Sequence, residues 1–354
     1  MTDIFDKILK NGESIFLNDA ALDFEFIPSV LLHRENQQAY IGESIRLLEK
    51  GRNGINLFIH GHPGIGKTLA TRYILRQVEE NTDEISTFYI NCWKHNTSYK
   101  IIVELCNLLN HKFIGDKSTH ELINEIKPRL NKKPIVICLD EVDKLENDDV
   151  LYFILEEVYK KTLILITNER SWLDELDKRI RSRLYADLLE FKSYNYEETF
   201  DILKKRCEYA FYPSVINKTL IEIIAKKSHE IQDIRSGIHL LKESGNLAES
   251  RSSKIINEED VNKAIMKLNE FKIRSSNDIS KEKNELLSLV KDNSGKQASE
   301  IFKLYDKDIS YKTFRRRLEE LQNSKLITLE NKQNASKGLV TYVYFGLIKN
   351  LNEF

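Results

Sequence analysis

Cysteine is scarce in this chain of 354 residues, and its placement excludes two classes of protein. The sequence has four cysteines, and they form no C-x-x-C pair. No histidine lies at the spacing of a zinc finger, so a disulfide-rich secreted scaffold and a cysteine-ligated zinc domain are both excluded. We expect Cys92, Cys106, Cys138 and Cys207 to be buried thiols in a reducing compartment.

Long apolar runs are also missing. No stretch approaches the roughly 18 uninterrupted apolar residues that a membrane-spanning helix needs. Residues 1–7 lack a basic region followed by an apolar run, and the chain has no internal repeat or low-complexity tract. These absences favour a cytoplasmic protein without a membrane partner.

Net charge is small as well, at −1 from 54 basic and 55 acidic residues. With 41% hydrophobic and 31% charged residues, the composition is that of a soluble globular protein, and the length favours about two or three domains. Residues 281–354 contain 14 basic and 10 acidic residues, a net charge of +4. This mild bias permits nucleic-acid binding at the C-terminal end without requiring it.

One glycine-rich stretch fits the pattern G-x-x-x-x-G-K-[ST]. It lies between an apolar run at 55–60, which predicts a buried strand, and a helical pattern at 69–75. Its residues, with the first of the helix, are Gly61, His62, Pro63, Gly64, Ile65, Gly66, Lys67, Thr68 and Leu69. Backbone N–H groups of such a loop converge on phosphate oxygens, Lys67 neutralises β/γ-phosphate charge, and the Thr68 hydroxyl ligates Mg²⁺. The alternative is an ordinary glycine turn, which the flanking strand and helix disfavour.

Polar residues end two further predicted strands. Residues 134–139 form a continuous apolar run of the kind that parallel sheets bury on both faces, and Asp140 and Glu141 follow it. In doubly wound folds, this edge of the sheet binds ligands. Asp140 is suited to hold Mg²⁺ through water, and Glu141 to polarise the water that attacks a γ-phosphate. Asn168 follows the next run, 162–167, and is placed to help orient that water.

Other patterns complete an α/β domain. Further strands are predicted at 84–91 and 188–191, and helices at 97–109 and at 115–130, the latter capped by Ser118 or Thr119. Residues 1–27 have no sustained period and predict an irregular arm. Val30 and Leu31, which precede a helix through residues 40–48, are candidates for an apolar contact with adenine, although both fit an ordinary core equally well.

Beyond residue 195 the pattern becomes helical. Helices are predicted at about 196–211, 217–228, 233–250 and 258–271, which together make a small bundle. Arg235, near the start of the third helix, is placed to reach a nucleotide, with a plain surface arginine as the alternative. Residues 176–184 hold Arg179, Arg181 and Arg183 at alternate positions, which on their own fit a solvated basic turn.

The C-terminal region is set off by a change of pattern. Residues 272–280 lose the apolar period and predict a linker. After it come predicted helices at 281–291, 296–305 and 311–322, the last capped by Ser310, and strands at 326–329 and 339–345 around a polar loop at 330–338. Three helices followed by a β-hairpin is the element order of a winged helix, a relative of the helix-turn-helix.

Helical geometry gives the helix at 311–322 two faces. Apolar residues at spacings of three and four predict an inward face made of Tyr311, Phe314, Leu318 and Leu321. The opposite face can enter a major groove, with Lys312 or Arg316 reaching base edges. The residues assigned to DNA contact are Lys312, Thr313, Arg315, Arg316 and Arg317 of the helix, and Lys332 and Lys337 of the hairpin. The alternative is a solvated charged face on a protein-interaction domain, which Glu319 and Glu320 favour.

Taken together, these motifs resemble those of an AAA+ ATPase in order and spacing. They are residues 61–68, Asp140-Glu141, Asn168, the segment 179–183 and Arg235. With the lead-in Pro28…His33-Arg34-Glu35, the segment Tyr89-Ile90-Asn91-Cys92 and the terminal winged helix, nearly the whole chain resembles the archaeal replication initiators related to the eukaryotic origin recognition complex and cell division control proteins. The implied fold is an AAA+ P-loop α/β domain with a parallel sheet (1–193), a helical lid (194–272) and a C-terminal winged-helix DNA-binding domain (281–354).

The resemblance also implies roles for individual residues. Lys67 and Thr68 match Walker A, Asp140 and Glu141 match Walker B, Asn168 matches sensor 1, and Arg235 matches sensor 2. Arg183 lies in the Ser-Arg-Leu position where many AAA+ proteins carry the arginine finger, which acts on ATP held by a neighbouring subunit. Arg179 and Arg181 are rivals for that role. The implied catalytic residues are therefore Glu141, Asn168, Arg183 and Arg235.

The chain departs from the family pattern at two points. Gln232 stands where a glycine usually precedes Asp-x-Arg at sensor 2. The hairpin, or wing, lacks the Gly-x-Gly-Arg often found there. An initiator-specific insertion is expected near residues 93–99.

The function implied by the resemblance is that of an ATP-dependent, origin-binding initiator of DNA replication. It implies ATP or ADP and Mg²⁺ as cofactors, and double-stranded origin DNA, the replicative helicase and other initiator subunits as partners. ATP is expected to act mainly as a switch, with slow hydrolysis when no partner supplies a finger. Two alternatives stay open: a DNA-binding regulator whose nucleotide is structural, and another AAA+ machine such as a loader or transposition helper.

Overall fold

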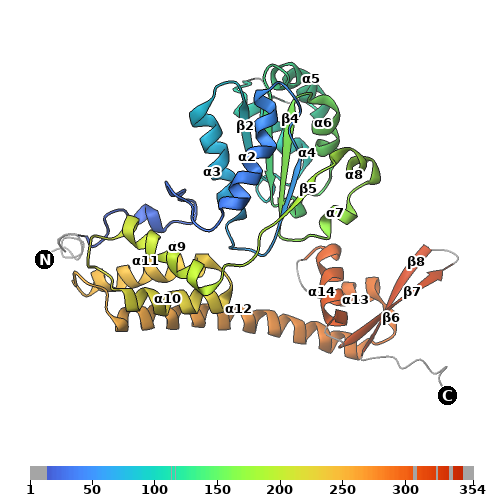
Figure 1. The fold of residues 1–354 in the computed structure, drawn as a ribbon. Coiled ribbons are helices and arrows are strands. Elements are labelled where there is room, and N and C mark those ends of the chain that lie inside the picture. Colours follow the sequence, from blue (N-terminus) through green and yellow to red (C-terminus); the bar gives the residue numbers. More distant parts are fainter. Residues whose placement is uncertain are drawn as a thin grey trace, which may run out of the picture. The chain divides into compact units, whose positions relative to one another are not determined.

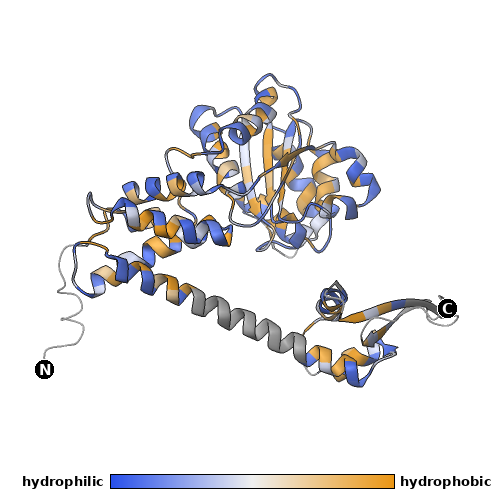
Figure 2. Ribbon diagram, turned by 60° about the horizontal axis from the view of Figure 1, so that its bottom comes forward, coloured by the Kyte–Doolittle hydropathy of each residue, from blue (hydrophilic) through white to orange (hydrophobic). Residues whose placement is uncertain are grey.

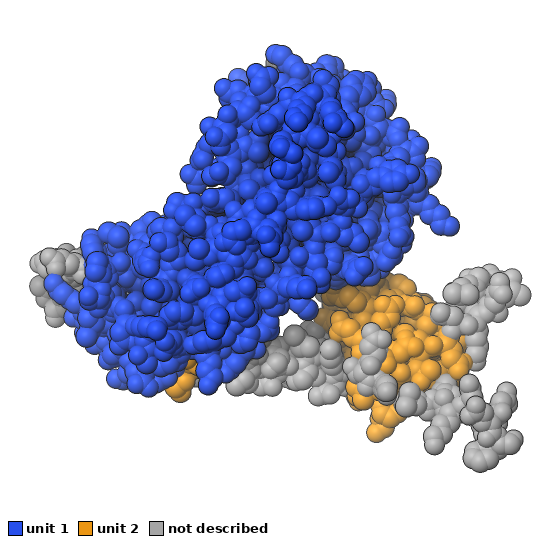
Figure 3. Space-filling model, viewed as in Figure 1, with its two compact units in different colours: residues 1–264 blue, residues 265–354 orange. Residues whose placement is uncertain are grey.

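The computed structural model describes residues 14–112, 114–115, 117–305, 309–323, 326–334 and 338–345. Contacts divide the chain into two compact units, residues 1–264 and 265–354 (Figure 3). The finer boundaries expected from the sequence, at 1–193, 194–272 and 281–354, stay predictions.

A five-stranded parallel sheet forms the centre of the first unit (Figure 1). The strands are β1 (Leu57–His60), β2 (Ser86–Asn91), β3 (Ile135–Asp140), β4 (Lys161–Thr167) and β5 (Asp187–Glu190). They are arranged in the order β2-β3-β4-β1-β5, and every pairing is parallel. The parallel α/β fold expected from the apolar runs is therefore confirmed.

Helices cover both faces of this sheet, whose strands are largely apolar (Figure 2). Along β3, which is buried throughout, alternate residues pack into two different hydrophobic clusters, as a strand covered on both faces requires. One cluster includes residues of α4 (Ser98–Leu108), α5 (Thr119–Leu130) and α6 (Asp149–Glu157). The other includes residues of α2 (Glu35–Glu49) and α3 (Lys67–Asn81). Ser118 is the residue that caps α5, where its side chain forms a capping box with Glu121.

The sequence patterns predicted β4 but not the helices between β3 and β5. They are η2 (Val142–Lys144), α6, α7 (Trp172–Glu175) and α8 (Lys178–Leu184). The α6 segment begins with a nearly continuous apolar run, which hides the helical period. The arginine-rich segment is the short helix α8 and not a turn, because the Asp177 side chain caps it by accepting the N–H of Arg179 at 2.7 Å.

A helical bundle completes the first unit, as the sequence predicts. It contains α9 (Tyr196–Ala210), α10 (Lys218–Ile231), α11 (Ile234–Ser250) and the first part of α12 (Glu258–Asp292). The N-terminal residues from Ser14 to Ile27 are irregular apart from η1 (Asp19–Leu22) and a bridge at Phe16, as the sequence predicts, but they pack against this bundle. The Phe16 ring lies 5.0 Å from that of Phe211, and Arg206 donates to the carbonyl of Ala21 at 2.9 Å. Single aromatic side chains such as Phe16 hold this segment against the bundle, and such isolated contacts produce no periodic pattern in the sequence.

α12 also differs from the prediction. A linker was expected at 272–280, but one helix runs from Glu258 to Asp292. The segment lacks an apolar period, yet it contains neither proline nor glycine, so nothing in its backbone ends the helix.

The second unit has the element order of a winged helix. After α12 come β6 (Lys296–Gln297), α13 (Ala298–Leu304), α14 (Tyr311–Asn323), β7 (Ile327–Asn334) and β8 (Gly338–Phe345). The strands form an antiparallel sheet in the order β6-β8-β7. Its core includes Val290, Ile301, Phe314, Leu318 and Val343. The expected winged-helix fold is confirmed.

Three local predictions in this unit are wrong. The polar segment expected as a loop is mostly strand, since Glu330 pairs with Tyr342 and the ladder extends to Asn334 and Gly338. Backbone pairing between strands does not require apolar side chains, so a polar sequence is not sufficient evidence for a loop. Lys296–Gln297 pairs with β8 before the helix begins. Tyr311, expected on the inward face, is 42% exposed, because it lies at the first turn of α14.

Within the described ranges, no helix is long and apolar enough to cross a membrane.

Candidate nucleotide-binding site

The glycine-rich loop connects β1 to α3 and has the backbone conformation that only glycine adopts freely. Gly61, Gly64 and Gly66 have φ values of 147°, 72° and 89°, and α3 begins directly afterwards at Lys67. A Cβ at Gly66 would lie 2.8 Å from the Tyr194 hydroxyl, and a Cβ at Gly64 would collide with the Asp233 carboxylate. The loop thus presents its amides at a helix N-terminus, an arrangement suited to bind phosphate.

The Lys67 ammonium group is held inside this loop. It is 6% exposed and donates to the carbonyls of Gly61 at 2.7 Å and His62 at 2.8 Å, and to the Asn168 side-chain oxygen at 2.8 Å. Burial lowers its pKa to about 8, although the nearby Asp140 carboxylate acts in the opposite direction. Asn168 follows β4, and it lies next to the loop because β4 pairs with β1.

A carboxylate and a hydroxyl face one another beside the loop. Thr68 Oγ1 donates to Asp140 Oδ2 at 2.6 Å, and Asp140 is 2% exposed. Mg²⁺ is usually held by one or two carboxylates together with substrate phosphates and waters. Among the described residues, no group of three His, Cys, Asp or Glu side chains is arranged to hold a metal ion. These two oxygen donors therefore fit a magnesium ion that is bound together with a nucleotide.

Glu141 has an unusual backbone and a perturbed carboxyl group. Its φ of 57° is left-handed, which costs a residue other than glycine on the order of 1–3 kcal/mol and is common at functional sites. Burial raises the pKa of its carboxyl, and the Asp140 charge adds to this, whereas a hydrogen bond with the Asn91 side chain lowers it. A raised pKa brings a carboxylate closer to the range in which it accepts a proton from water at neutral pH.

The helical bundle reaches the phosphate loop through the start of α11. The N–H of Ile234 donates to the carbonyl of Gly64 at 3.2 Å. Arg235 is held by the Asp233 carboxylate, with Nη2 to Oδ2 at 2.8 Å, and lines the same cleft as Lys67 and Glu141. Its guanidinium therefore faces the place where phosphates would lie.

Gln232 explains why glycine is usual at its position. It has a φ of 59° and ends α10 in the left-handed conformation. Glycine adopts this conformation without strain, whereas glutamine does so at a cost of about 1–2 kcal/mol. Gln232 thus takes a backbone conformation that glycine would adopt without strain.

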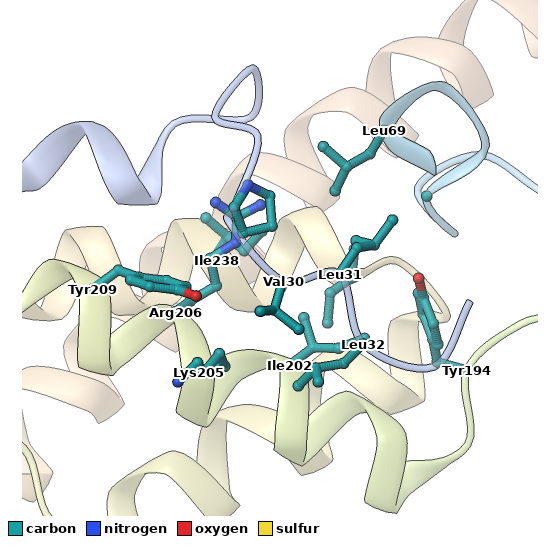
Figure 4. A pocket seen from close by; sticks show the side chains of 13 residues that line it. Val30, Leu31, Leu32, Leu69, Tyr194, Ile202, Lys205, Arg206, Tyr209 and Ile238 are labelled. Carbon is teal, nitrogen blue, oxygen red and sulfur yellow. The ribbon is translucent and has the colours of Figure 1, made fainter. Parts of the chain in front are cut away.

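An apolar pocket of about 470 Å³ lies next to the loop (Figure 4). It is formed by the segment before α2, the start of α3, the residues after β5, and helices α9 and α11. Val30, which is 51% exposed, and Leu31, which is buried, both line it, as does Leu69. Figure 4 shows Tyr209 and Ile202 contributed by the bundle. Its apolar lining suits a nucleobase.

A larger cleft brings most of the other predicted residues together, although Gly61, His62 and Ile65 of the loop are not among the residues that line it. Its lining includes Pro63, Gly64, Gly66, Lys67, Thr68, Leu69, Asp140, Glu141, Asn168 and Arg235. Leu69 and Gly66 line both this cleft and the apolar pocket, so the two are adjacent. The combined space has an apolar end for a base and a cationic end for phosphates.

Two family models match the chain: an AAA domain over residues 52–169 and a Cdc6 AAA+ ATPase-type lid domain over residues 200–266. ORC1-type DNA replication protein 1 of Sulfurisphaera tokodaii is 36% identical over 282 residues, which are 75% of this chain and 70% of that protein. The chain belongs to the ORC1-type DNA replication proteins. The resemblance to archaeal replication initiators is confirmed, and membership of an AAA+ ATPase family supports nucleotide binding by the chain.

Other relatives match more of the chain. ORC1-type DNA replication protein 2 of Methanothermobacter thermautotrophicus is 29% identical over 341 residues, which are 90% of this chain and 89% of that protein. The solved structure of the Aeropyrum pernix ORC1 protein in complex with DNA has a TM-score of 0.70 at 22% identity and covers 95% of this chain and 94% of that one. Cdc6p of Pyrobaculum aerophilum has a TM-score of 0.65 at 19% identity, with coverage of 94% and 95%. At these identities the two structures establish a shared fold.

Several residues at or beside this site were not assigned from the sequence, three arginines among them. Arg34 is 4% exposed and donates to the carbonyls of Ile65 at 3.0 Å and Lys192 at 2.7 Å, while its guanidinium lies 3.9 Å from the centre of the Tyr194 ring. Arg206 and Arg72 line the cleft, and Arg206 also lines the apolar pocket. Only the lead-in motif around Arg34 offered a signal; the other two lie on ordinary helical faces.

The arginines of α8 do not join the cleft. Arg179, Arg181 and Arg183 are not among the described residues that line the cleft. Arg183 pairs with Glu156 and lies over the Tyr152 ring, Arg181 pairs with Asp174 at 2.9 Å, and Arg179 pairs with Asp177 at 3.2 Å. Which of the three is the arginine finger, acting on ATP bound by another subunit, therefore stays a prediction.

In the second unit, α14 separates apolar from charged residues. Phe314, Leu318 and Leu321 are buried, whereas the Arg316 side chain is 73% exposed. Lys312 is exposed and Thr313 partly exposed. Arg315 is 4.0 Å from Glu319, and Arg317 donates to the Tyr305 hydroxyl at 3.0 Å, which turns it toward the unit's own core. Lys337 and the side chain of Lys332 lie outside the described residues.

Proposed function

We propose that this ORC1-type chain is an ATP-dependent replication initiator that binds double-stranded origin DNA and helps to recruit the replicative helicase. One observation carries the proposal. The phosphate loop, the carboxylates after β3 and Arg235 converge on one cleft, in a chain whose second unit is a winged helix. A switchable nucleotide site joined to a DNA-binding fold is what an initiator needs.

The cleft would hold ATP with its adenine in the apolar pocket and its phosphates on the loop amides and Lys67. Mg²⁺, held by Thr68 and through water by Asp140, would neutralise the β/γ-phosphate oxygens when bound. Arg235 would reach the γ-phosphate from the bundle, so the presence of that phosphate would favour a closed arrangement of sheet and bundle.

Hydrolysis needs a water positioned in line with the γ-phosphorus. Glu141 would accept a proton from that water and Asn168 would orient it, while the new P–O bond forms and the bond to the β–γ bridging oxygen breaks. The products are ADP and inorganic phosphate. We expect slow turnover in the isolated chain, because Arg183 and its two neighbours lie outside its own cleft and would act on ATP bound by another initiator subunit.

The relative from Aeropyrum pernix supports DNA as the partner, since its solved structure contains DNA. On this chain, the exposed face of α14 offers Lys312, Thr313 and Arg316, with Arg315 beside them. Arg317 is the weaker candidate because it is bound to Tyr305. Lys332 and Lys337 of the hairpin stay candidates for backbone contact.

The decisive experiment is selective binding of the purified protein to fragments of its own genome, over a salt series, with ATP and with ADP. We expect a few fragments to be retained, and Arg316→Ala to remove that preference and weaken binding. Arg46→Ala is the matched control, because Arg46 is a comparably exposed arginine on α2. Binding that ignores both sequence and Arg316 would contradict the proposal and favour a protein-contact role for the winged helix.

A DNA-binding regulator with a structural nucleotide is the second candidate. Glu141→Gln separates the two, because it removes the proton acceptor without changing the shape of the cleft. An initiator that cycles between nucleotide states loses about 100-fold or more of its ATP turnover in this variant and keeps ATP binding. Unchanged turnover would favour the regulator.

A further inference from the structure

Tyr89 lies on β2 and reaches toward the carboxylate at the end of the neighbouring strand. β2 and β3 pair in parallel, with Tyr89 opposite Cys138 and Asn91 opposite Asp140. The ring packs in the same hydrophobic cluster as α3, while the hydroxyl donates to Asp140 Oδ2 at 2.7 Å. The hydroxyl thus reaches the Asp140 carboxylate from the neighbouring strand.

Asp140 is held by three donors, from β2, from α3 and from the residue that follows it. Oδ2 accepts from Tyr89 at 2.7 Å and from Thr68 Oγ1 at 2.6 Å, and Oδ1 accepts the N–H of Glu141 at 2.9 Å. An ionised carboxylate has about four acceptor positions. One position, on Oδ1, is therefore left for a water of a bound metal ion, and the other contacts decide which way it points.

The ring of Tyr89 is itself held in place. The Arg72 guanidinium lies 5.4 Å from its centre, a cation–π distance. Arg72 follows Thr68 by one turn of α3 and lines the nucleotide cleft. The two residues of α3 therefore bracket the same Tyr89–Asp140 pair, one through the ring and one through the carboxylate.

We propose that Tyr89 is a positioning residue of the magnesium site, whose phenol orients the Asp140 carboxylate for the metal. The inference rests on the proposed binding of ATP with Mg²⁺. Without the phenol, Oδ2 keeps only Thr68, and the carboxylate can rotate away from the orientation that a metal-bound water needs. Loss of such an outer contact typically costs about 10–100-fold in metal affinity.

The test is Tyr89→Phe, which removes one oxygen and keeps the packed ring. Binding of ADP carrying an N-methylanthraniloyl label is measured by fluorescence as MgCl₂ is titrated, and again in EDTA. We expect the MgCl₂ concentration at half-maximal effect to rise about tenfold, with metal-free ADP affinity unchanged. Tyr40→Phe is the matched control, since the Tyr40 hydroxyl donates to Asp187 Oδ2 at the same 2.7 Å away from the cleft.

Each other outcome overturns the inference. A Tyr89→Phe protein with an unchanged MgCl₂ midpoint shows that the phenol does not orient the carboxylate. Equal losses of affinity with Mg²⁺ and in EDTA show that Tyr89 supports the loop as a whole. If the unsubstituted chain binds labelled ADP without any effect of Mg²⁺, the proposed ATP–Mg²⁺ function fails together with the inference, whereas the first two results leave that function intact.

Discussion

At the scale of single residues, the nucleotide cleft is built from polar groups that already have partners. Lys67 is bound by two loop carbonyls and by Asn168, and Asp140 accepts three hydrogen bonds. Buried polar groups that are satisfied in this way hold their geometry before a ligand arrives. Such preorganisation favours nucleotide binding because little ordering remains to be done.

Gln232 provides a test of backbone strain at this scale. Its left-handed conformation suits glycine, so Gln232→Gly should raise the free energy of unfolding by about 0.5–1 kcal/mol, after the greater freedom of glycine in the unfolded chain is subtracted. Gln232→Ala is the control, because it also removes the bond from Nε2 to the His229 carbonyl but keeps Cβ. Urea unfolding measures both. Equal gains in the two variants would show that φ is not the cause.

At the scale of elements, the site depends on where parallel strands end. β1 lies between β4 and β5, and β3 pairs with β4, so the loop after β1 and the polar residues after β3 and β4 meet at one edge. The bundle closes this edge through the contact between Ile234 and Gly64. The nucleotide cleft is therefore a junction of elements and not a feature of any one of them.

Gly64→Ala tests that junction. A Cβ at this position would collide with the Asp233 carboxylate and would also strain a φ of 72°. We expect binding of labelled ADP to weaken by at least about tenfold, because loss of one hydrogen bond to a charged phosphate costs about 1.5–3 kcal/mol and about 1.4 kcal/mol is tenfold in affinity. Gly42→Ala is the control, since nothing lies within 4 Å of its added Cβ in α2, and it should stabilise the chain by about 0.5–1 kcal/mol. Normal ADP affinity in Gly64→Ala would contradict the close approach.

β1 also carries a pH-dependent contribution to stability. Burial of His60 lowers its pKa below the ordinary value of 6.5, and the charge of Arg170 lowers it further, although Glu190 acts in the opposite direction. The folded chain therefore binds fewer protons here than the unfolded chain, so stability is lost as pH falls through and below about 6.5.

His60→Gln should flatten this loss. The free energy of unfolding, measured by thermal unfolding without nucleotide from pH 7.5 to pH 5, should decrease less steeply in the variant. The difference in slope should be smaller than about 1.4 kcal/mol per pH unit, which is the limit for one proton. His33→Gln is the control, since the partly exposed His33 bonds Asp201 at the surface. Parallel pH profiles for His60→Gln and the unsubstituted chain would contradict the prediction.

At the scale of the whole molecule, nucleotide and DNA candidates lie in different compact units. The cleft belongs to residues 1–264, and the charged face of α14 to residues 265–354. α12 begins in the first unit and ends in the second. A nucleotide signal that alters DNA binding has to pass between the units.

Hydrogen exchange can locate that signal. With ADP and Mg²⁺ at about 100 times the dissociation constant, binding stabilises the nucleotide-binding unit by about 2.7 kcal/mol. We expect slower exchange in residues 57–81, 135–145 and 234–250, and no change in residues 311–323, when no DNA is present. Mass spectrometry of peptides from these segments measures the effect. Equal protection of α14 would show that the two units respond as one body.

The sequence by itself was sufficient for the five strands of the parallel sheet, for the helices of the bundle and for the residues of the phosphate loop. Continuous apolar runs predicted the central strands, and the spacing of Phe314, Leu318 and Leu321 predicted the buried face of α14, because burial on a regular element imposes a period. The loop motif was readable because glycine conformation and phosphate contact need those residue types in adjacent positions.

Only the tertiary structure decided which distant side chains meet. Arg72 and Arg206 line the cleft through helix packing, and Tyr89 contacts Asp140 through strand pairing. A single sequence carries no signal for a contact between residues that are far apart in the chain. The continuous α12 and the long hairpin were missed for a related reason. Helix continuation and strand pairing depend on backbone hydrogen bonds, which the polarity of side chains does not report.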